Sequence, residues 1–221
     1  MIIAILSSSM EKILVVDKPI GKTSHDMVAL YRKKLGIKKI GHAGTLDPFA
    51  SGVLILLIGK ATKRFEEFMD LEKEYEMEIE LGWSTDTLDL TGKIVKKLSS
   101  QEISNIKLTE EKIKKAVLSF KGEYIQDVPI FSAVKLRGKP LYKYARKGIR
   151  TIIPKRKVNI YKIKLVSIKL NQVKYPKVKI NVVCSTGTYL RSLALDIGEC
   201  LNIPSTAVAL KRLRVGDFKL G

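Results

Sequence analysis

Eight consecutive residues alternate strictly between glutamate and an apolar side chain. The run Glu74–Leu81 reads EYEMEIEL, so apolar residues occupy every second position: Tyr75, Met77, Ile79 and Leu81. Because successive side chains of a strand point to opposite faces of a sheet, a period of two predicts a strand with one hydrated face and one buried face. The chain must therefore build at least one sheet with a packed side.

Strand and helix patterns are mixed along the rest of the chain, without regular strand–helix–strand alternation. Further strands are expected at Ile13–Val16, Gly52–Ile58, Gly92–Lys97, Ser132–Leu136, Val158–Leu170, Val178–Cys184 and Val208–Phe218, with Gly92–Lys97 as the partner of the alternating strand. Helices are expected at Thr23–Leu35, Ala61–Leu71, Thr109–Gly122, Pro140–Gly148 and Gly187–Leu201. We predict an α+β fold with a mixed, mostly antiparallel central sheet and flanking helices and loops.

The length of 221 residues fits a single domain, predicted over residues 1–221. Residues 1–10 are interpreted as a non-essential lead, since their apolar run has no preceding basic residues and makes a poor signal peptide. The longest apolar runs fall far short of the ~20 residues of a membrane-spanning helix. With only two cysteines, Cys184 and Cys200, and no export signal, a cytoplasmic protein is expected.

The charge is strongly basic and unevenly spread. Lys and Arg number 41 against 22 Asp and Glu, a formal net charge of +19. Acids are concentrated in Glu66–Asp89, whereas Val128–Leu195 has none and carries 17 basic residues. A long stretch of one sign is typical of phosphate binding, and its tyrosines could stack on bases. RNA or DNA is therefore the favoured partner, and the short apolar runs disfavour a membrane.

Several kinds of chemistry lack their motifs. A phosphate-binding P-loop needs a second glycine five residues before the glycine of its Gly-Lys-Thr. Gly21-Lys22-Thr23 lacks that glycine, and neither G-x-G-x-x-G nor G-x-S-x-G occurs. His25 and His42 do not combine with the two cysteines in a zinc-binding spacing. We expect no metal and no nucleotide cofactor.

Asp47 is the strongest candidate for a reactive side chain. It lies in a glycine-rich segment, Gly41–Pro48 (GHAGTLDP), which is expected to be a loop directly before an apolar strand. A turn aspartate before proline is common, so this local pattern alone favours a structural role for Asp47.

Six segments together resemble one protein family. GHAGTLDPFASGVLILLIGKATK resembles the catalytic motif of the TruB family of tRNA pseudouridine synthases. Five more segments resemble blocks of that family in the family's order: VVDKPIGKTSHD, KEYEMEIELGWSTDTLDLTG, FSAVKLRGKPLYKYARKGI, CSTGTYLRSLALDIG and LKRLRVGDF. The resemblance covers Ile13 to Phe218 and implies the pseudouridine synthase fold. It also implies isomerisation of uridine to pseudouridine at position 55 in the T loop of tRNA, without cofactor or metal.

The resemblance assigns catalytic roles to three residues. Asp47 is the implied nucleophile, acting on a flipped-out uridine, and Arg191 its ion-pair partner. The ring of Tyr75 would stack on the target uracil, and its hydroxyl would serve as a base for a proton at C2′. Tyr75 also lies on the apolar face of its strand, so core packing is the competing interpretation and both can hold.

Four more residues are implied to bind substrate. Tyr189 and Leu210 match residues that line the family's base pocket, although Leu210 could equally be core. His42, as a lone histidine, could be structural; by resemblance it contacts the flipped nucleotide. Lys18 belongs to the first motif, which would support the catalytic loop or touch the substrate. The basic stretch would hold the T arm, and a monomer is expected.

The chain departs from the family pattern at its end. Bacterial members usually continue into a small RNA-binding domain of PUA type, whereas this sequence stops at Gly221, either naturally or by truncation. Two other interpretations stay open: a non-catalytic RNA-binding or tRNA-folding module, and a guide-RNA-dependent pseudouridine synthase.

Overall fold

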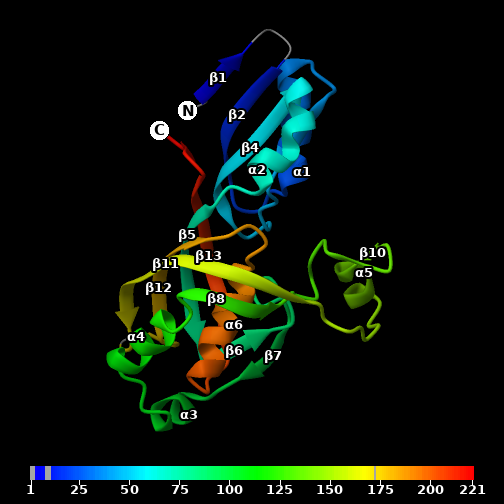
Figure 1. Ribbon diagram of the computed structural model, residues 1–221. Helices are drawn as coiled ribbons and strands as arrows, with labels where there is room; N and C mark the ends of the chain where they lie inside the picture. Colours follow the sequence, from blue (N-terminus) through cyan, green and yellow to red (C-terminus); the bar gives the residue numbers. More distant parts are fainter. Residues whose placement is uncertain (1–2, 8–10, 172) are drawn as a thin grey trace. The chain divides into compact units, whose positions relative to one another are not determined.

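The computed structural model describes residues 3–7, 11–171 and 173–221, which form two compact units (Figure 1). The first unit contains Met1–Glu76, Val182–Thr186 and Ala209–Gly221, and the second contains Met77–Asn181 and Gly187–Val208. Three strands have residues in both units: β5 (Lys73–Leu81), β12 (Lys177–Cys184) and β13 (Ser205–Val215). The single domain expected from the length stays a prediction.

The first unit is built around β4 (Ser51–Gly59). This strand pairs antiparallel with β2 (Glu11–Lys18) along its whole length. Its other edge is shared between β3 (Ile40–Ala43), which is antiparallel, and β13, which pairs in parallel where Arg212 lies opposite Gly52. β1 (Ile3–Ser7) pairs with β2 at the sheet's edge, and β14 (Phe218–Lys219) pairs with β13.

Both faces of β4 are covered, which explains its unbroken apolar run. On one face, Leu54 and Leu56 pack with Met27 and Tyr31 of α1 (Ser24–Leu35). On the other face, the strand packs with Phe68 of the short helix α2 (Phe65–Met69). A strand buried on both sides needs apolar residues at every position and not in alternation.

The second unit contains the remaining strands and four helices of the described residues. β8 (Gly122–Asp127) pairs antiparallel with β11 (Lys155–Lys169), and β6 (Trp83–Thr85) pairs with β7 (Ile94–Lys97). β9 (Lys135–Leu136) and β10 (Lys139–Pro140) form a small hairpin. The helices are α3 (Ser100–Asn105), α4 (Glu110–Leu118), α5 (Leu141–Arg146) and α6 (Leu190–Cys200).

Several predictions from the sequence are confirmed. The α+β class holds, and the sheet is mixed: β1–β2, β2–β4 and β8–β11 pair antiparallel, and β13 pairs with β4 in parallel. In β5 the burial alternates at every residue, with Met77, Ile79 and Leu81 fully buried. Helix α1 starts at the capping box formed by Thr23 and Asp26 and ends at Gly36, which has a left-handed backbone.

Other predictions are wrong. Gly92–Lys97 is not a strand beside β5, because β7 pairs with β6. The Ala61–Leu71 helix is a 3-10 turn, η1 (Lys60–Arg64), followed by α2. The Gly41–Pro48 loop begins inside β3, and only residues 135–136 of the Ser132–Leu136 segment form a strand. The helix expected up to Gly122 ends at Leu118.

Two elements were not foreseen, and part of the chain lies outside the description. β8 carries three exposed positions and one fully buried glutamine, so its pattern is weak. α3 is one and a half turns long, too short for a periodic signal. Of the presumed lead, residues 3–7 form β1, whereas residues 1–2 and 8–10 lie outside the described residues. No helix among the described residues is long and apolar enough to cross a membrane.

Candidate active site

The loop that carries Asp47 is anchored on both sides of this residue, by the turn after β2 and by the first residue of α1. The backbone N–H of Gly21 donates to the carbonyl of Pro48 at 2.8 Å. The N–H of Leu46 donates to the hydroxyl of Ser24 at 2.9 Å, and Ser24 is buried. The segment that resembles the family's first motif therefore holds the loop that resembles its catalytic motif, and Asp47 is kept half-buried between two fixed neighbours.

A buried arginine supports the same loop from β13. Arg212 is 1% exposed, and its Nε donates to the carbonyl of Val53 at 2.7 Å. Its Nη2 donates to the carbonyl of Gly44 at 2.9 Å. Arg212 was not selected from the sequence, but a usable signal exists, because it follows Leu210 by two residues on a strand and so shares its inward face.

Two lysines are buried in the same unit. Lys18 donates from Nζ to the carbonyls of Pro19 at 2.9 Å and Lys22 at 2.7 Å. Burial lowers the pKa of Lys18, and the nearby Asp47 opposes this shift. Burial likewise lowers the pKa of Lys73 to about 8, with Arg212 contributing. Since Lys18 is fully buried, its contacts favour the supporting role over direct substrate binding.

Tyr75 lies in this cationic surrounding. It is 8% exposed, and its electrostatic neighbours include Arg212 and Asp47. Burial raises the pKa of its hydroxyl, and Arg212 offsets part of that shift. At neutral pH the side chain is therefore an uncharged phenol, which suits a ring that packs against a base.

His42 and Leu210 complete the predicted residues of the first unit. His42 lies on β3, and its ring meets that of His25 edge-on at 6.0 Å between centroids. Burial, with smaller effects of His25 and Arg212, lowers the pKa of His42 to about 4, so the imidazole is neutral at pH 7. Its Nδ1 is buried without a hydrogen-bond partner among the described residues. Leu210 is 7% exposed on β13.

Tyr189 and Arg191 belong to the second unit, at the start of α6. Tyr189 is the N-cap residue of this helix, and Arg191 is in its first turn and 4% exposed. The guanidinium of Arg191 donates to the carbonyls of Thr87 at 2.7 Å and Phe131 at 3.0 Å. Its Nε lies 3.7 Å from a carboxylate oxygen of Asp89. The ion pair between Asp47 and Arg191 stays a prediction.

Asp89 is a second residue that the sequence did not single out. It is 5% exposed, and its Oδ1 accepts hydrogen bonds from the N–H and hydroxyl of Thr91 at 2.9 and 2.5 Å. The hydroxyl of Thr87 donates to the same oxygen at 2.9 Å. The signal is the Thr-x-Asp-x-Thr spacing within the segment STDTLDLTG, because hydroxyls two residues away can satisfy a buried carboxylate.

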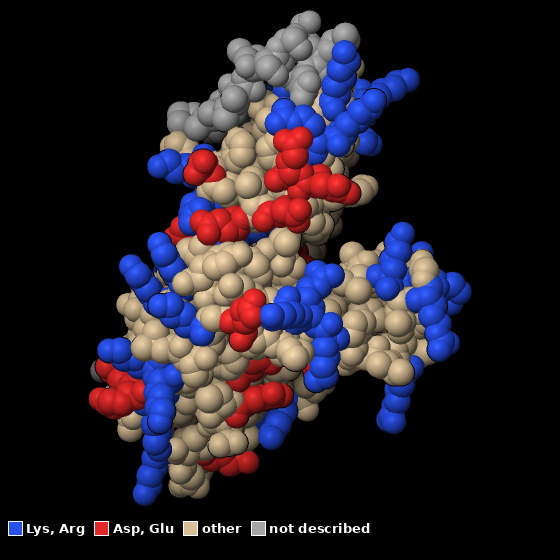
Figure 2. Space-filling view, in the orientation of Figure 1, with Lys and Arg blue, Asp and Glu red and all other residues tan. Residues whose placement is uncertain are grey.

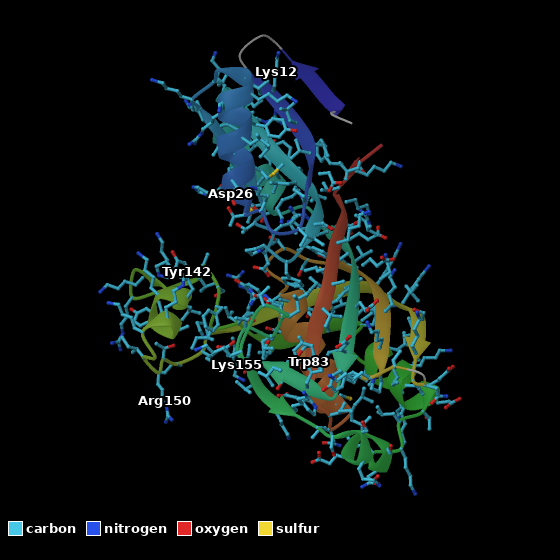
Figure 3. All side chains as sticks on the ribbon, turned by 180° about the vertical axis from the view of Figure 1, so that it is seen from behind. Lys12, Asp26, Trp83, Tyr142, Arg150 and Lys155 are labelled. Carbon is cyan, nitrogen blue, oxygen red and sulfur yellow. The ribbon has the colours of Figure 1, made fainter. Side chains whose placement is uncertain are left out.

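A basic segment of the second unit provides a surface for phosphates. Between β9 and the residues after α5 the exposed side chains include seven cations: Lys135, Arg137, Lys139, Lys143, Arg146, Lys147 and Arg150. Figure 2 shows blue side chains and no red ones on the visible side of the lobe that carries α5 and β10. Tyr142 and Arg150, labelled in Figure 3, both belong to this lobe. The guanidinium of Arg146 lies 5.2 Å from the ring centroid of Tyr142.

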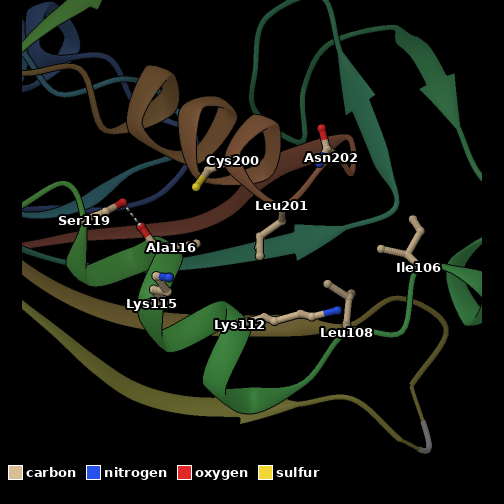
Figure 4. Close-up of a pocket in the computed structure, with 9 residues that line it drawn as sticks. All are labelled: Ile106, Leu108, Lys112, Lys115, Ala116, Ser119, Cys200, Leu201 and Asn202. Atoms are coloured by element: carbon tan, nitrogen blue, oxygen red, sulfur yellow. Dashed lines mark hydrogen bonds between the residues drawn. The ribbon is translucent and has the colours of Figure 1, made fainter.

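A pocket elsewhere in the second unit does not involve the predicted residues. It measures about 550 Å³ and lies between α4 and the end of α6 (Figure 4). Its lining is largely apolar with two lysines, and Ser119 on its wall bonds to the carbonyl of Ala116. Among the described residues no group of three or more His, Cys, Asp or Glu is placed to bind a metal ion.

The fold is that of a class of RNA-modifying enzymes, and comparison with known proteins identifies the family. Residues 32–190 match the model of the TruB family pseudouridylate synthase N-terminal domain. The tRNA pseudouridine synthase B of Caldicellulosiruptor saccharolyticus is 46% identical over 96% of this chain and 69% of its own length. That of Caldanaerobacter subterraneus is 45% identical over 96% of this chain and 71% of its own length.

Solved structures agree with this family. A Cbf5–Nop10–Gar1 complex contains a chain with 31% identity and a TM-score of 0.69, matched over 95% of this chain. An H/ACA ribonucleoprotein bound to a substrate RNA contains one with 28% identity and a TM-score of 0.65. The present chain spans about half the length of those solved chains. The chain belongs to the TruB family of pseudouridylate synthases.

Proposed function

We propose that this chain converts uridine to pseudouridine at position 55 in the T loop of tRNA, with Asp47 as nucleophile. The observation that carries the proposal is the triple anchoring of the Asp47 loop: by Gly21, by Ser24 and by Arg212. A loop held from both sides and from β13 keeps one carboxylate in a fixed position beside a buried tyrosine, as positional catalysis requires. Curated relatives with 45–46% identity are named tRNA pseudouridine synthase B.

The reaction is an isomerisation that needs no net electron transfer. The N1–C1′ bond of uridine breaks, the uracil turns, and C5 bonds to C1′; the proton lost from C5 is balanced by one gained at N1. The target base must first leave the stack, which costs a few kcal/mol and least in a loop. Tyr75 would then stack on the extruded uracil; the raised pKa of its hydroxyl favours this stacking role over that of base for the C2′ proton.

The remaining residues divide between holding the base and holding the RNA. His42, Tyr189 and Leu210 would line the base pocket, and Arg191 would be the ion-pair partner of Asp47. Lys18 would support the Asp47 loop indirectly, by bonding the carbonyls of Pro19 and Lys22 in the turn that anchors it. The basic lobe around α5 would contact phosphates of the T arm, mainly by shape and charge. A cytoplasmic monomer, with residues 1–221 as the catalytic domain, belongs to the same proposal.

Guide-RNA dependence is the alternative that a specific observation supports, because both solved neighbours come from complexes of the H/ACA type or of Cbf5. Identity favours the stand-alone mode, at 45–46% with the tRNA enzymes against 28–31% with those chains. Activity on a T-arm hairpin in the absence of any other RNA separates the two. A module that only binds or folds tRNA would retain binding and form no pseudouridine.

The test is pseudouridine formation on a T-arm hairpin with the wild-type chain and with Asp47→Asn. The wild type should convert the target uridine, and Asp47→Asn should lose about three orders of magnitude or more of the rate, because an amide is a poor nucleophile. Binding of the hairpin should be retained within a few-fold. Turnover by Asp47→Asn close to that of the wild type would remove the assignment of Asp47.

A further inference from the structure

A buried glutamine of β8 hydrogen-bonds to the backbone N–H and carbonyl of Tyr189. Gln126 is 1% exposed. Its Oε1 accepts from the N–H of Tyr189 at 2.8 Å, and its Nε2 donates to the carbonyl of the same residue at 3.1 Å. One side chain thus pairs with both backbone groups of a residue 63 positions away, in the manner of a neighbouring strand.

These two hydrogen bonds lie at the start of α6. Tyr189 is the N-cap residue of α6 and makes no capping bond with its side chain. Its carbonyl also accepts the N–H of Leu193 at 3.0 Å, the hydrogen bond that starts the helix. Because these two hydrogen bonds from Gln126 are to the backbone of Tyr189, they can fix the start of α6 without using the phenol ring. Arg191 follows two residues later on the same helical turn.

The chemistry of the contact requires an amide. A backbone N–H can only donate and a carbonyl can only accept, so the partner must present one acceptor and one donor side by side. Gln126 does so, and its Nε2 also bonds the hydroxyl of Tyr124. The carboxyl of Asp196 on α6 is close enough to Tyr124 and Gln126 for their side chains to lower its pKa, against the larger opposing effect of burial. This network sets the orientation of the amide.

We propose that Gln126 is a positioning residue for the isomerisation: its amide fixes the backbone of Tyr189 and with it the first turn of α6, which carries Arg191. The proposal rests on the proposed function, since the roles of Tyr189 and Arg191 come from it. A shift of about 1 Å in such a group can lower a rate by about 10²-fold.

Replacement by glutamate gives a test that a merely structural role would not pass. Ionised glutamate has only acceptors and would face the carbonyl of Tyr189, whereas protonated glutamate restores a donor. The groups around this position are Tyr124 on β8, Asp196 and Glu199 on α6, Asp127 with its partner Lys155, and Arg156 opposite on β11. Burial and the neighbouring acids should raise the pKa of the new carboxyl.

The experiment measures single-turnover rates and KM on a T-arm hairpin for Gln126→Ala, Gln126→Glu and a matched control, from about pH 5.5 to about pH 8. The control is Ser192→Ala, because the hydroxyl of Ser192 joins the same two elements by donating to the carbonyl of Asp127 at 2.8 Å, a hydrogen bond in which Tyr189 takes no part. Gln126→Ala should lose about 10–100-fold in rate with little change in KM, and Ser192→Ala about twofold or less. The rate of Gln126→Glu relative to wild type should rise about fivefold or more as the pH falls.

Hydrogen exchange supplies a readout that does not depend on activity. The amide of Tyr189 should exchange faster in Gln126→Ala than in Ser192→Ala. Equal exchange in the two variants, a Gln126→Ala rate equal to that of the wild type, or a flat pH profile for Gln126→Glu would overturn the proposal. If Gln126→Ala does not fold, the pH profile of Gln126→Glu decides. Loss of the proposed function would look different, since the wild type itself would form no pseudouridine.

Discussion

At the level of single residues, the exit of the Asp47 loop depends on a glycine that no other residue can replace. Gly52 has φ +103, a backbone conformation that side chains with a Cβ rarely adopt. A Cβ at this position would also lie 2.1 Å from the carbonyl oxygen of Arg212. Gly52 and Arg212 are opposite each other in the parallel pairing of β4 with β13, so the backbones need this close approach.

Gly52→Ala should therefore destabilise the protein strongly. The expected loss is about 2–4 kcal/mol in the free energy of unfolding, from backbone strain and displacement of β13. Urea denaturation measures it. Gly41→Ala is the matched control, because its nearest neighbour is Thr62 Cγ2 at 3.8 Å, an ordinary contact. Equal midpoints for the two variants would contradict the role assigned to Gly52.

At the level of secondary-structure elements, α6 carries an ionisable group against β8. Burial, assisted by the negative charge of Glu199, raises the pKa of Asp196 to about 6. Its Oδ2 has no hydrogen-bond partner among the described residues. A carboxyl whose pKa is higher in the folded than in the unfolded state stabilises the fold fully below its unfolded pKa of 3.8. That contribution is lost as the pH rises through about 6.

Asp196→Asn should accordingly be more stable than the wild type at neutral pH, by about 1–2 kcal/mol after allowance for solvent screening. The advantage should shrink as the pH falls and vanish near pH 4, where both forms are neutral. Thermal or urea unfolding across this range tests it. Glu199→Gln should give a smaller gain of the same sign, because it removes a secondary cause of the raised pKa of Asp196 and leaves that carboxyl buried. A constant difference between Asp196→Asn and wild type at all pH values would refute the assignment.

At the level of the whole molecule, the net charge of +19 should govern RNA affinity. If 6–10 phosphates are contacted, affinity for a T-arm hairpin should fall by about 10³–10⁵ between 50 and 200 mM salt. Lys143→Ala with Arg146→Ala should lower the slope of log affinity against log salt by about 2. The control is the double variant Lys33→Ala with Lys34→Ala on α1, which removes two positive charges outside the lobe, so the salt slopes of the two double variants can be compared. A flat salt response would reject phosphate binding by this charge.

Local chemistry explains which elements were predictable. The alternation in β5 and the capping box of α1 are properties of neighbouring residues, and both appear in the structure where expected. The β7 strand was expected, yet its partner was mistaken: it pairs with β6, a strand of three residues that is too short to give a periodic signal. The short α3 and β8 gave too little periodic signal for the sequence to reveal them.

The residues of the candidate site also divide into those that the sequence predicts and those that only the structure reveals. The sequence alone determined the α+β class, the basic segment and, through motif resemblance, the choice of Asp47, Tyr75 and Arg191. Only the tertiary structure selected Arg212 and Gln126, whose hydrogen-bond partners lie on other elements, and Asp89, whose ionic partner Arg191 lies on α6. A buried polar side chain is defined by what satisfies it. That information resides in long-range contacts, which a linear pattern of residue types does not contain.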